Sequence, residues 1–459
     1  MPLRPLRTSV NTPIVLVVGF NLFTLAVLVT APVWWDTENL RTMCLLVLVS
    51  QVLLLVGFQI GRRTGLSAYA RVKLPLSSGR SLMRFLIVVY PLAALIGYAY
   101  RMGYAPWDVS GMYALLLAGV FDRHFGYEMA LRGTGLGPLP WRVYFVASIV
   151  TQWFFIAGFL QWRQMGRLAK LLFAVFVCGE LFFAMGRGTS FGIVSMVTTF
   201  FLSTMFWAKS ARSTAGSAIV SALLVLVLFG GSVGFFSYNL YSRSKNVERE
   251  LEISEFKNSN TILDHWTLAV VPEALRPTYM NVVSYLAGGY YHASLAMDLE
   301  FQPTFFLGSN TSLMGLAALF GVDVWNRTYM HRLQVARGVD EIGVWHSAYT
   351  WYAGDVSFYG VPFLLFGFGY LFGFSWTRAR HGDFLSGVLF IMFGNMLLFL
   401  FANNTYLASV FYSLMFLLPF WFITRVLPFV PAAAISGSRR RRPTPAFPRP
   451  LQSGGEALR

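Results

Sequence analysis

Long apolar segments recur along this 459-residue chain, and they restrict its fold more than any other feature. An α-helix needs about 20 consecutive apolar residues to cross the hydrocarbon core of a bilayer. Only 12 % of the residues are charged, about half the share of an ordinary soluble domain. We therefore predict an all-α polytopic membrane protein with about ten helices, within a range of 10–12. The predicted spans lie near 13–32, 42–60, 85–103, 142–162, 170–185, 189–208, 217–238, 356–375, 385–402 and 406–424.

The distribution of charge predicts the orientation of these spans. The net charge is +16, and with the N-terminus inside, the inner segments hold 22 of the 36 Lys and Arg residues but only 2 of the 20 acidic residues. An excess of Lys and Arg in short cytoplasmic loops is the usual determinant of orientation. We expect both termini to be cytoplasmic. The "SRRRR" stretch at 438–442 is best interpreted as an anchor on anionic lipid, so we expect no nucleic-acid partner.

The spans divide the chain into four parts. Residues 1–238 would form the first seven helices, 239–355 a large outer loop, 356–425 the last helices and 426–459 a disordered basic tail. The outer loop is far longer than an ordinary connection. Its two semi-apolar stretches, 279–297 and 303–321, are predicted to form interfacial or re-entrant helices. Long loops of this kind often carry function.

The stretch "FVCGELFFAMGRGTSFGIVSM" at 176–196 breaks an apolar run with Gly186, Arg187 and Gly188. Glycines let the backbone bend and let a ligand approach closely, and the start of the next helix favours an anion. Arg187 is therefore a candidate phosphate ligand on the outer face, or alternatively an interfacial arginine that reaches to headgroups. Glu180, in mid-span, would form a hydrogen bond or ion pair between helices, or serve a proton-coupled transporter.

The outer loop is rich in cationic side chains. Arg276, Arg327 and Arg332 are candidates for binding an anion, although Arg327, Arg332 and Arg337 could equally form a solvated helix face. His346 is the candidate general base, or else a hydrogen-bonded packing histidine. Asp340 or Asp355 would support it, and Asp355 could instead cap a helix or bind a sugar hydroxyl.

Metal and thiol chemistry receive little support from the sequence. The acidic pairs Asp36/Glu38 and Asp298/Glu300 are weak metal candidates, so we expect neither a metal site nor a cofactor. Both cysteines lie inside apolar runs, which argues against a disulfide.

Two motifs resemble those of a known family. The break "MGRGTSFGIV" and the late stretch "YTWYAGDVSFYGVPF" are similar to signatures of the Wzy-type polymerases, bacterial membrane enzymes that join oligosaccharide repeat units. The second motif departs from the pattern because Phe358-Tyr359-Gly360 stands where Phe-Gly would follow the aspartate directly. Arg327 and Gly338 also match an Arg-x(10)-Gly spacing, although so many glycines make chance matches common.

The resemblance implies a fold like that of the membrane C-type (GT-C) glycosyltransferases, a bacterial inner-membrane location and a large periplasmic loop. The implied substrates are polyprenyl-diphosphate-linked oligosaccharides, and the implied partners are membrane lipids, a chain-length regulator and a flippase. Arg187, Arg276, Arg327 and Arg332 would bind the diphosphate, while His346, Asp355 and Asp340 would be catalytic. An O-antigen ligase of the same architecture, or a polytopic transporter or flippase, remains an alternative.

Overall fold

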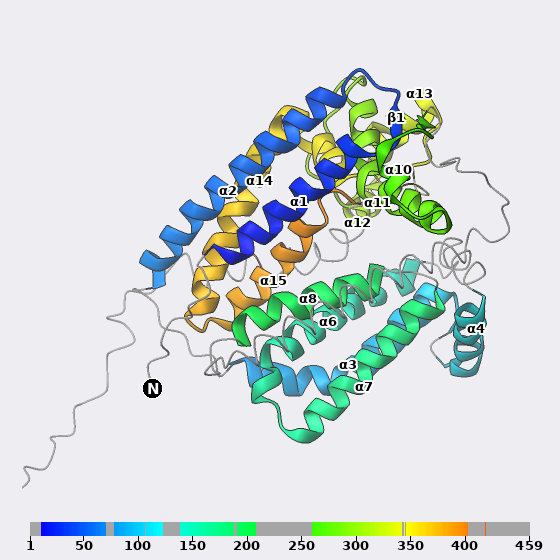
Figure 1. Cartoon of the computed structure of the whole chain (residues 1–459). Helices are drawn as coiled ribbons and strands as arrows, with labels where there is room; N and C mark the ends of the chain where they lie inside the picture. Colours follow the sequence, from blue (N-terminus) through cyan, green and yellow to red (C-terminus); the bar gives the residue numbers. More distant parts are fainter. Residues whose placement is uncertain are drawn as a thin grey trace, which may run out of the picture.

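The computed structural model describes residues 11–69, 78–105, 107–122, 138–187, 191–207, 259–341, 344, 346–402 and 418. Apart from a short two-stranded ribbon, the regular structure is helical (Figure 1). The long helices are α1 (Thr12–Thr30), α2 (Leu40–Tyr69), α3 (Ser78–Met102), α4 (Val109–Phe121), α6 (Pro138–Gln161), α7 (Arg167–Gly186), α8 (Phe191–Trp207), α11 (Arg276–Ala296), α14 (Ala348–Arg380) and α15 (Phe384–Leu398). The short elements are η1 (Trp162–Gln164), α10 (Trp266–Val270), η2 (Glu273–Leu275), α12 (Thr311–Leu319), η3 (Trp325–Arg327), α13 (Tyr329–Arg337), and strands β1 (Val33–Trp35) and β2 (Ser259–Thr261).

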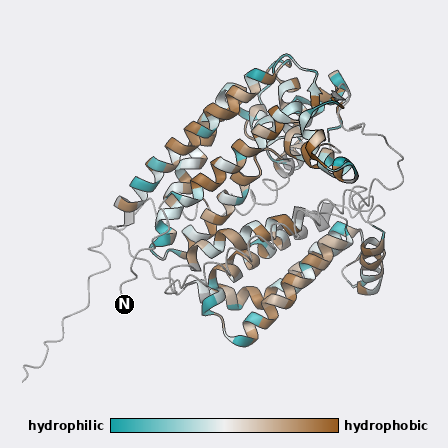
Figure 2. Cartoon of the chain, viewed as in Figure 1, coloured by the Kyte–Doolittle hydropathy of each residue, from teal (hydrophilic) through white to brown (hydrophobic). Residues whose placement is uncertain are grey.

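The apolar segments form helices wherever the structure describes them. Within those residues, five helices are long and apolar enough to cross a bilayer, namely α1, α2 (residues 40–66), α3 (residues 81–102), α7 and α14. Shorter or partly described helices, α6, α8 and α15, coincide with three more predicted spans. Figure 2 shows apolar residues along most of the length of these helices. The chain is an all-α membrane protein in its broad class. The predicted spans 217–238 and 406–424 lie outside the described residues, except for the helical residue Leu418.

Glycines bring α2 and α14 into backbone contact. A Cβ atom on Gly57 would lie 2.1 Å from the carbonyl oxygen of Phe366, and one on Gly61 would lie 2.0 Å from that of Tyr370. Gly369 and Gly373 face the α2 carbonyl groups in the same way, at 2.2 and 2.1 Å. Two Gly-x-x-x-Gly pairs therefore interlock, which is a common way for membrane helices to pack. The order of the contacts along both helices shows that α2 and α14 run parallel.

Helix α15 lies at the centre of the bundle. All of its residues from Phe384 to Leu398 are buried, as is expected of a helix that is apolar on every face. It packs on α14 and α1 on one side and on α8 and α6 on the other. Polar side chains add specific contacts there: Asn21 of α1 donates to the Leu397 carbonyl at 2.9 Å, and Asn395 donates to the Thr199 hydroxyl at 2.8 Å.

A group of short elements covers one end of the bundle. We call this group the cap and define it as residues 259–347, apart from 342, 343 and 345. The cap contains α10 to α13 and is joined to the N-terminal half by the ribbon, in which Val33 pairs with Thr261 (Figure 1). Helix α12 has only nine residues and is too short to cross a bilayer, as expected for an interfacial helix.

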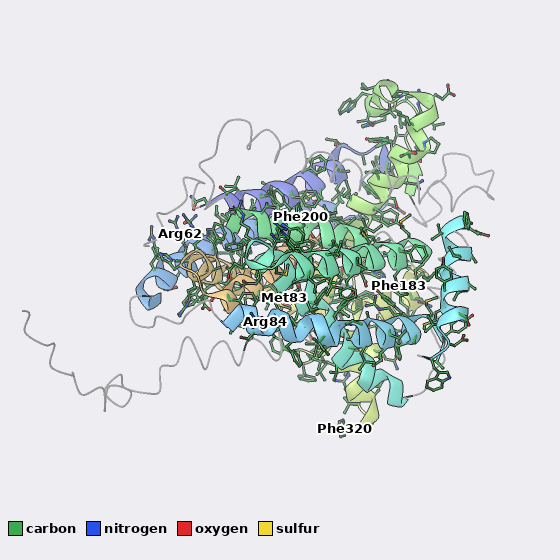
Figure 3. The ribbon with its side chains drawn as sticks, turned by 90° about the horizontal axis from the view of Figure 1, so that it is seen from below. Arg62, Met83, Arg84, Phe183, Phe200 and Phe320 are labelled. Carbon is green, nitrogen blue, oxygen red and sulfur yellow. The ribbon has the colours of Figure 1, made fainter. Side chains whose placement is uncertain are left out.

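Basic side chains gather at the end of the bundle opposite to the cap. Figure 3 shows Arg62 and Arg84 toward one end and Phe183 and Phe320 toward the other. The C-terminal turns of α14 add Arg378 and Arg380 to the basic end.

Helical structure begins before the expected boundary between the outer loop and the next span. Helix α14 begins at Ala348, eight residues before the predicted start of this span, and Ser347 is its N-cap. Asp355 therefore lies inside the helix instead of capping it. A kink follows at Ser357, whose φ of 63° and ψ of 164° are not helical.

Candidate functional site

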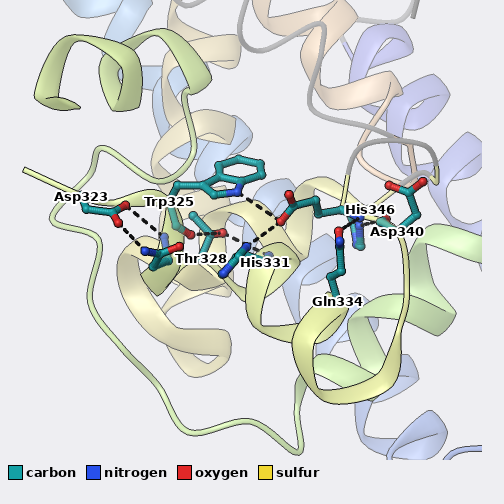
Figure 4. A network of polar contacts seen from close by, with 9 residues as sticks. Asp323, Trp325, Thr328, His331, Gln334, Asp340 and His346 are labelled. Carbon is teal, nitrogen blue, oxygen red and sulfur yellow. Dashed lines mark hydrogen bonds and ion pairs between the residues drawn. The ribbon is translucent and has the colours of Figure 1, made fainter. Parts of the chain in front are cut away.

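Polar and cationic side chains gather around α13 in the cap. We call the group Trp325, Arg327, His331, Arg332 and Glu341 the α13 cluster, and Figure 4 shows Trp325 and His331 with their polar contacts. Thr328 is the N-cap of α13, and its hydroxyl accepts a hydrogen bond from the His331 N–H at 3.3 Å. This cap places His331 and Arg332 in the first turns of the helix, directly after Arg327 of η3.

His331 and Glu341 form an imidazole–carboxylate pair. Nδ1 of His331 lies 2.8 Å from Oε2 of Glu341, and both side chains are half-buried. The indole N–H of Trp325 donates to the same oxygen at 3.1 Å, while the Glu341 backbone N–H donates to the Gln334 side chain at 3.0 Å. Because the carboxylate accepts the Nδ1 proton, the lone pair of the neutral imidazole is on Nε2. This arrangement suits a general base whose orientation and tautomer are fixed by an acid.

Two predicted diphosphate ligands belong to the same cluster. Arg327, at the end of η3, is exposed. Arg332 donates to the Glu300 carbonyl at 2.6 Å and lies over the ring of Tyr329 at 5.4 Å. Its Nη1 atom is buried and has no hydrogen-bond partner among the described residues. The cluster therefore holds two guanidinium groups that can donate to an anion, an exposed one on η3 and a half-buried one on α13.

Packing on α14 fixes the α13 cluster near the membrane helices. The ring of Tyr329 lies 5.1 Å from that of Phe358, and the ring of Trp325 lies 6.5 Å from that of Trp351. Phe358 follows the kink at Ser357 directly. The cluster therefore lies beside the point where α14 bends.

His346 is close in sequence to this cluster but has a different environment. It is 1 % exposed, and its Nε2–H donates to the backbone carbonyl of Asp340 at 3.1 Å. Within the described residues, its Nδ1 atom has no hydrogen-bond partner. Burial, and next the neighbouring His292 ring at 5.4 Å, lower the pKa of His346 to about 3. Asp340 thus supports His346 through its backbone carbonyl.

The lowered pKa predicts a pH-dependent stability. Unfolded histidine has a pKa of about 6.5, so below that pH the unfolded chain binds a proton that the folded chain excludes. Because of His346, the free energy of unfolding should fall by about 1.4 kcal/mol for each pH unit as the pH falls from about 6.5 toward 3. We expect the melting temperature of the wild type in detergent to fall more steeply between pH 6.5 and 4.5 than that of His346→Gln. If the melting temperatures of the wild type and His346→Gln fall in parallel with pH, His346 is not buried as a neutral imidazole.

Asp355 makes structural contacts and none with the predicted base. Its carboxylate accepts hydrogen bonds from the Thr304 hydroxyl at 2.5 Å and from the N–H groups of Gly308 and Ser309, both at 3.0 Å. The Thr304 N–H donates to the Gly354 carbonyl at 3.0 Å. Asp355 therefore fixes the 304–309 loop to α14.

Arg187 lies at the C-terminus of α7, where the predicted break occurs. Its guanidinium group lies 5.6 Å from the centre of the Phe183 ring, and that of Arg101 from α3 lies 5.8 Å from the same ring. A Cβ atom on Gly186 would lie 2.8 Å from the Leu116 carbonyl oxygen, so this glycine allows α7 to approach α4. Residues 188–190 lie outside the described residues.

The remaining candidates have structural partners. Nε of Arg276 donates to the carbonyl groups of Leu268 at 3.1 Å and Val271 at 3.4 Å, which satisfies the end of α10. Glu180 accepts a hydrogen bond from the Tyr98 hydroxyl at 2.7 Å, which confirms the prediction of an interhelical contact. In the described part of the chain, no three His, Cys, Asp or Glu residues are placed to hold a metal ion.

The structure thus brings together some of the predicted residues and not others. Arg327 of η3 and Arg332 of α13 both lie in the cap, whereas Arg187 lies at the end of α7 and Asp355 binds a loop. His331, Glu341 and Arg101 had not been singled out as site residues. The spacing of His331 and Glu341 gives no signal by itself, because a turn at Gly338, with φ of 68°, brings them together.

The chain matches no protein-family model, and neither curated proteins nor solved structures show a significant similarity to it.

Proposed function

We propose that this chain is an inner-membrane polysaccharide polymerase. It would join polyprenyl-diphosphate-linked oligosaccharide repeat units at the periplasmic face of a bacterial inner membrane. The observation that carries the proposal is the α13 cluster, in which His331 of α13 forms an imidazole–carboxylate pair, with Arg332 next to it in sequence and Arg327 on the preceding η3, at one end of a bundle of apolar helices. The basic residues at the opposite end support a periplasmic cap and cytoplasmic termini.

The proposed reaction is an inverting glycosyl transfer without a metal. A hydroxyl group of the incoming repeat unit attacks the anomeric carbon of the growing chain, and its proton passes to Nε2 of His331. A new glycosidic bond forms as the bond between the anomeric carbon and the diphosphate oxygen breaks. Arg327 and Arg332 stabilise the negative charge that develops on the leaving lipid diphosphate, and Glu341 stabilises the imidazolium.

The base in this proposal is His331 rather than His346. A useful general base has a pKa near the working pH, and burial holds the pKa of His346 far below it. We assign His346 to packing of the cap. Asp355 and Arg276, which hold backbone groups, are assigned structural roles.

Arg187 and Arg101 would form a second cationic site for the lipid diphosphate or its acceptor. Both guanidinium groups lie against Phe183 at the end of the spans where the cap also lies. Arginine makes planar, multi-donor contacts with phosphate, and each charged hydrogen bond contributes about 1.5–3 kcal/mol. Membrane lipids, a chain-length regulator and a flippase are the partners that this function requires.

Replacing Arg187 by alanine is expected to shorten the polymer. Loss of one charged contact should slow polymerisation by about 10- to 100-fold. A deletion strain that carries Arg187→Ala should make mainly single repeats, whereas the wild type makes a ladder on a gel. Arg101→Ala should behave in the same way.

Arg163→Ala is the matched control, because Arg163 is exposed in η1 at the other end of α7. Membrane levels of all variants are compared by immunoblot. If Arg187→Ala gives a normal ladder, Arg187 does not bind the substrate. Loss of all surface glycan, including single repeats, would favour a ligase or a flippase instead.

A further inference from the structure

The 304–309 loop exposes two phenylalanines in a strained conformation. Phe305 and Phe306 have φ values of 56° and 62°, and their exposed fractions are 66 % and 64 %. The Leu307 N–H donates to the Thr304 carbonyl at 3.0 Å, so both phenylalanines occupy the centre of a tight turn. Such turns normally take Asn-Gly, because a side chain in the left-handed region costs about 1–2 kcal/mol. The two aromatic rings are therefore exposed on a turn whose backbone conformation lowers the stability of the fold.

Asp355 holds this turn in place. Its carboxylate accepts three hydrogen bonds from Thr304, Gly308 and Ser309, and Asp355 itself is 8 % exposed. Ser357, two residues later, is the remaining non-glycine residue with positive φ among the described residues. All three strained positions therefore lie at one junction between the loop and the kink of α14.

The register of α2 and α14 gives the depth of this junction. The two helices run parallel, and Gly57 lies beside Phe366. The residues before the kink fold back beside the rest of α14, because the ring of Tyr352 lies 5.6 Å from that of Phe368 and Gln51 donates to the Tyr349 hydroxyl at 2.9 Å. Phe358, the first residue after the kink and eight residues before Phe366, is level with Val49, eight residues before Gly57. Val49 is about 14 Å inside the start of α2, at 1.5 Å per residue, and Asp355 lies near this level. The turn is thus level with part of the bundle that is apolar enough to span a bilayer.

Exposed apolar side chains continue from this level along both helices. Leu45, Leu48 and Val49 are exposed on α2, and Tyr359 and Phe363 are exposed on α14 below the kink. Phe320, at the end of α12, is also exposed and lies at the edge of the molecule in Figure 3. Water at this depth would solvate these exposed apolar side chains, whereas hydrocarbon would cover them at no cost.

From these observations we infer that the Phe305–Phe306 turn is inserted in the hydrocarbon of the outer leaflet, and that Asp355 is the positioning residue that holds it there. The occupant of this surface is the acyl-chain region of the surrounding bilayer. The turn would anchor the cap to the membrane beside the α13 cluster. This inference does not depend on glycosyl transfer.

A spin label at position 306 tests the inference. Phe306→Cys is made in a chain that carries Cys44→Ala and Cys178→Ala, since these are the native cysteines. The labelled protein is placed in nanodiscs of phosphatidylethanolamine and phosphatidylglycerol, and collision with oxygen is compared with collision with a water-soluble nickel chelate. Val52→Cys, exposed in the middle of α2, is the lipid reference, and Val335→Cys, exposed on α13, is the water reference.

We expect the label at 306 to match Val52→Cys, with at least a fivefold higher oxygen-to-nickel ratio than at Val335→Cys. A ratio equal to that at Val335→Cys would overturn the inference. Adding Asp355→Asn should shift the ratio at 306 toward the water reference, because the amide offers an N–H group where an acceptor is needed. If the oxygen-to-nickel ratio at position 306 is unchanged by Asp355→Asn, Asp355 does not position the turn.

A second measurement covers the case in which the cysteine variants fail to fold. A benzophenone-bearing phenylalanine analogue at position 306 keeps the native ring and reacts with nearby C–H groups under light. Lipid adducts found by mass spectrometry are expected. Adducts confined to the protein would overturn the inference.

Discussion

Polymerisation should fall by about 10²–10⁴-fold when His331 is replaced by alanine, the range expected for loss of a positioned general base. The fold should be retained, because His331 is half-buried and its side chain contacts Glu341 rather than the core. Glu341→Gln should give an intermediate loss, since the amide can still accept the Nδ1 proton but carries no charge to stabilise the imidazolium. The rate is measured with purified protein and lipid-linked repeat units.

His381→Ala is the matched control for this experiment. His381 lies at the end of α14, where its Nδ1 contacts the Thr377 carbonyl at 2.8 Å, at the end of the bundle far from the cap. If His331→Ala polymerises at the wild-type rate while His346→Gln does not, the base is His346 and our assignment is wrong.

The fold should be strongly destabilised when a glycine of either pair between α2 and α14 is replaced by alanine. In Gly61→Ala, the new methyl carbon would lie 2.0 Å from the Tyr370 carbonyl oxygen, and backbone atoms cannot move aside as a flexible side chain can. We expect a loss at the upper end of overpacking costs, about 3 kcal/mol, and the same for Gly369→Ala. The protein should lose its single peak in size-exclusion chromatography and melt at a lower temperature.

Gly367→Ala is the control within the same helix. A Cβ atom at this position would meet nothing within 4 Å, and alanine favours helix over glycine by about 1 kcal/mol. This variant should be as stable as the wild type or slightly more stable. Equal melting temperatures for Gly61→Ala and Gly367→Ala would show that α2 and α14 are not in backbone contact.

The positions of the helices could be predicted from the sequence because hydrophobic length alone determines them. The predicted spans near 13–32, 42–60 and 170–185 differ from α1, α2 and α7 mainly at their ends. The start of α14 was missed because residues 348–355 are polar enough to resemble a loop. Their burial against the cap, which no local pattern reveals, makes them helical.

The candidate site was harder to predict because it depends on contacts between distant residues. The sequence identified Arg327 and Arg332 as cations on a loop, and the structure places them on the neighbouring elements η3 and α13. His346 looked like a base because of its position near the membrane, yet its burial makes it a weak one. Asp355 looked catalytic, but its three hydrogen bonds to the 304–309 loop depend on a contact across about 50 residues and could not be inferred from motif spacing.

The structure also bears on the alternative functions. A proton-coupled transporter would centre on Glu180, which instead accepts a hydrogen bond from Tyr98 at 2.7 Å. A ligase would use the same donor and the same arginines, so only the acceptor distinguishes it from a polymerase. Analysis of the products made by the purified protein therefore distinguishes these functions better than any single mutation.

The most direct test is reconstitution of the purified protein in liposomes with polyprenyl-diphosphate-linked repeat units extracted from a strain that lacks this protein. Mass spectrometry would follow both products. Our account predicts glycans of two or more repeat units on one lipid diphosphate, with one free polyprenyl diphosphate released for each bond formed, and no such products from His331→Ala. Transfer only after addition of a lipid A-core acceptor, or movement of the lipid across the bilayer with no new bond, would contradict it.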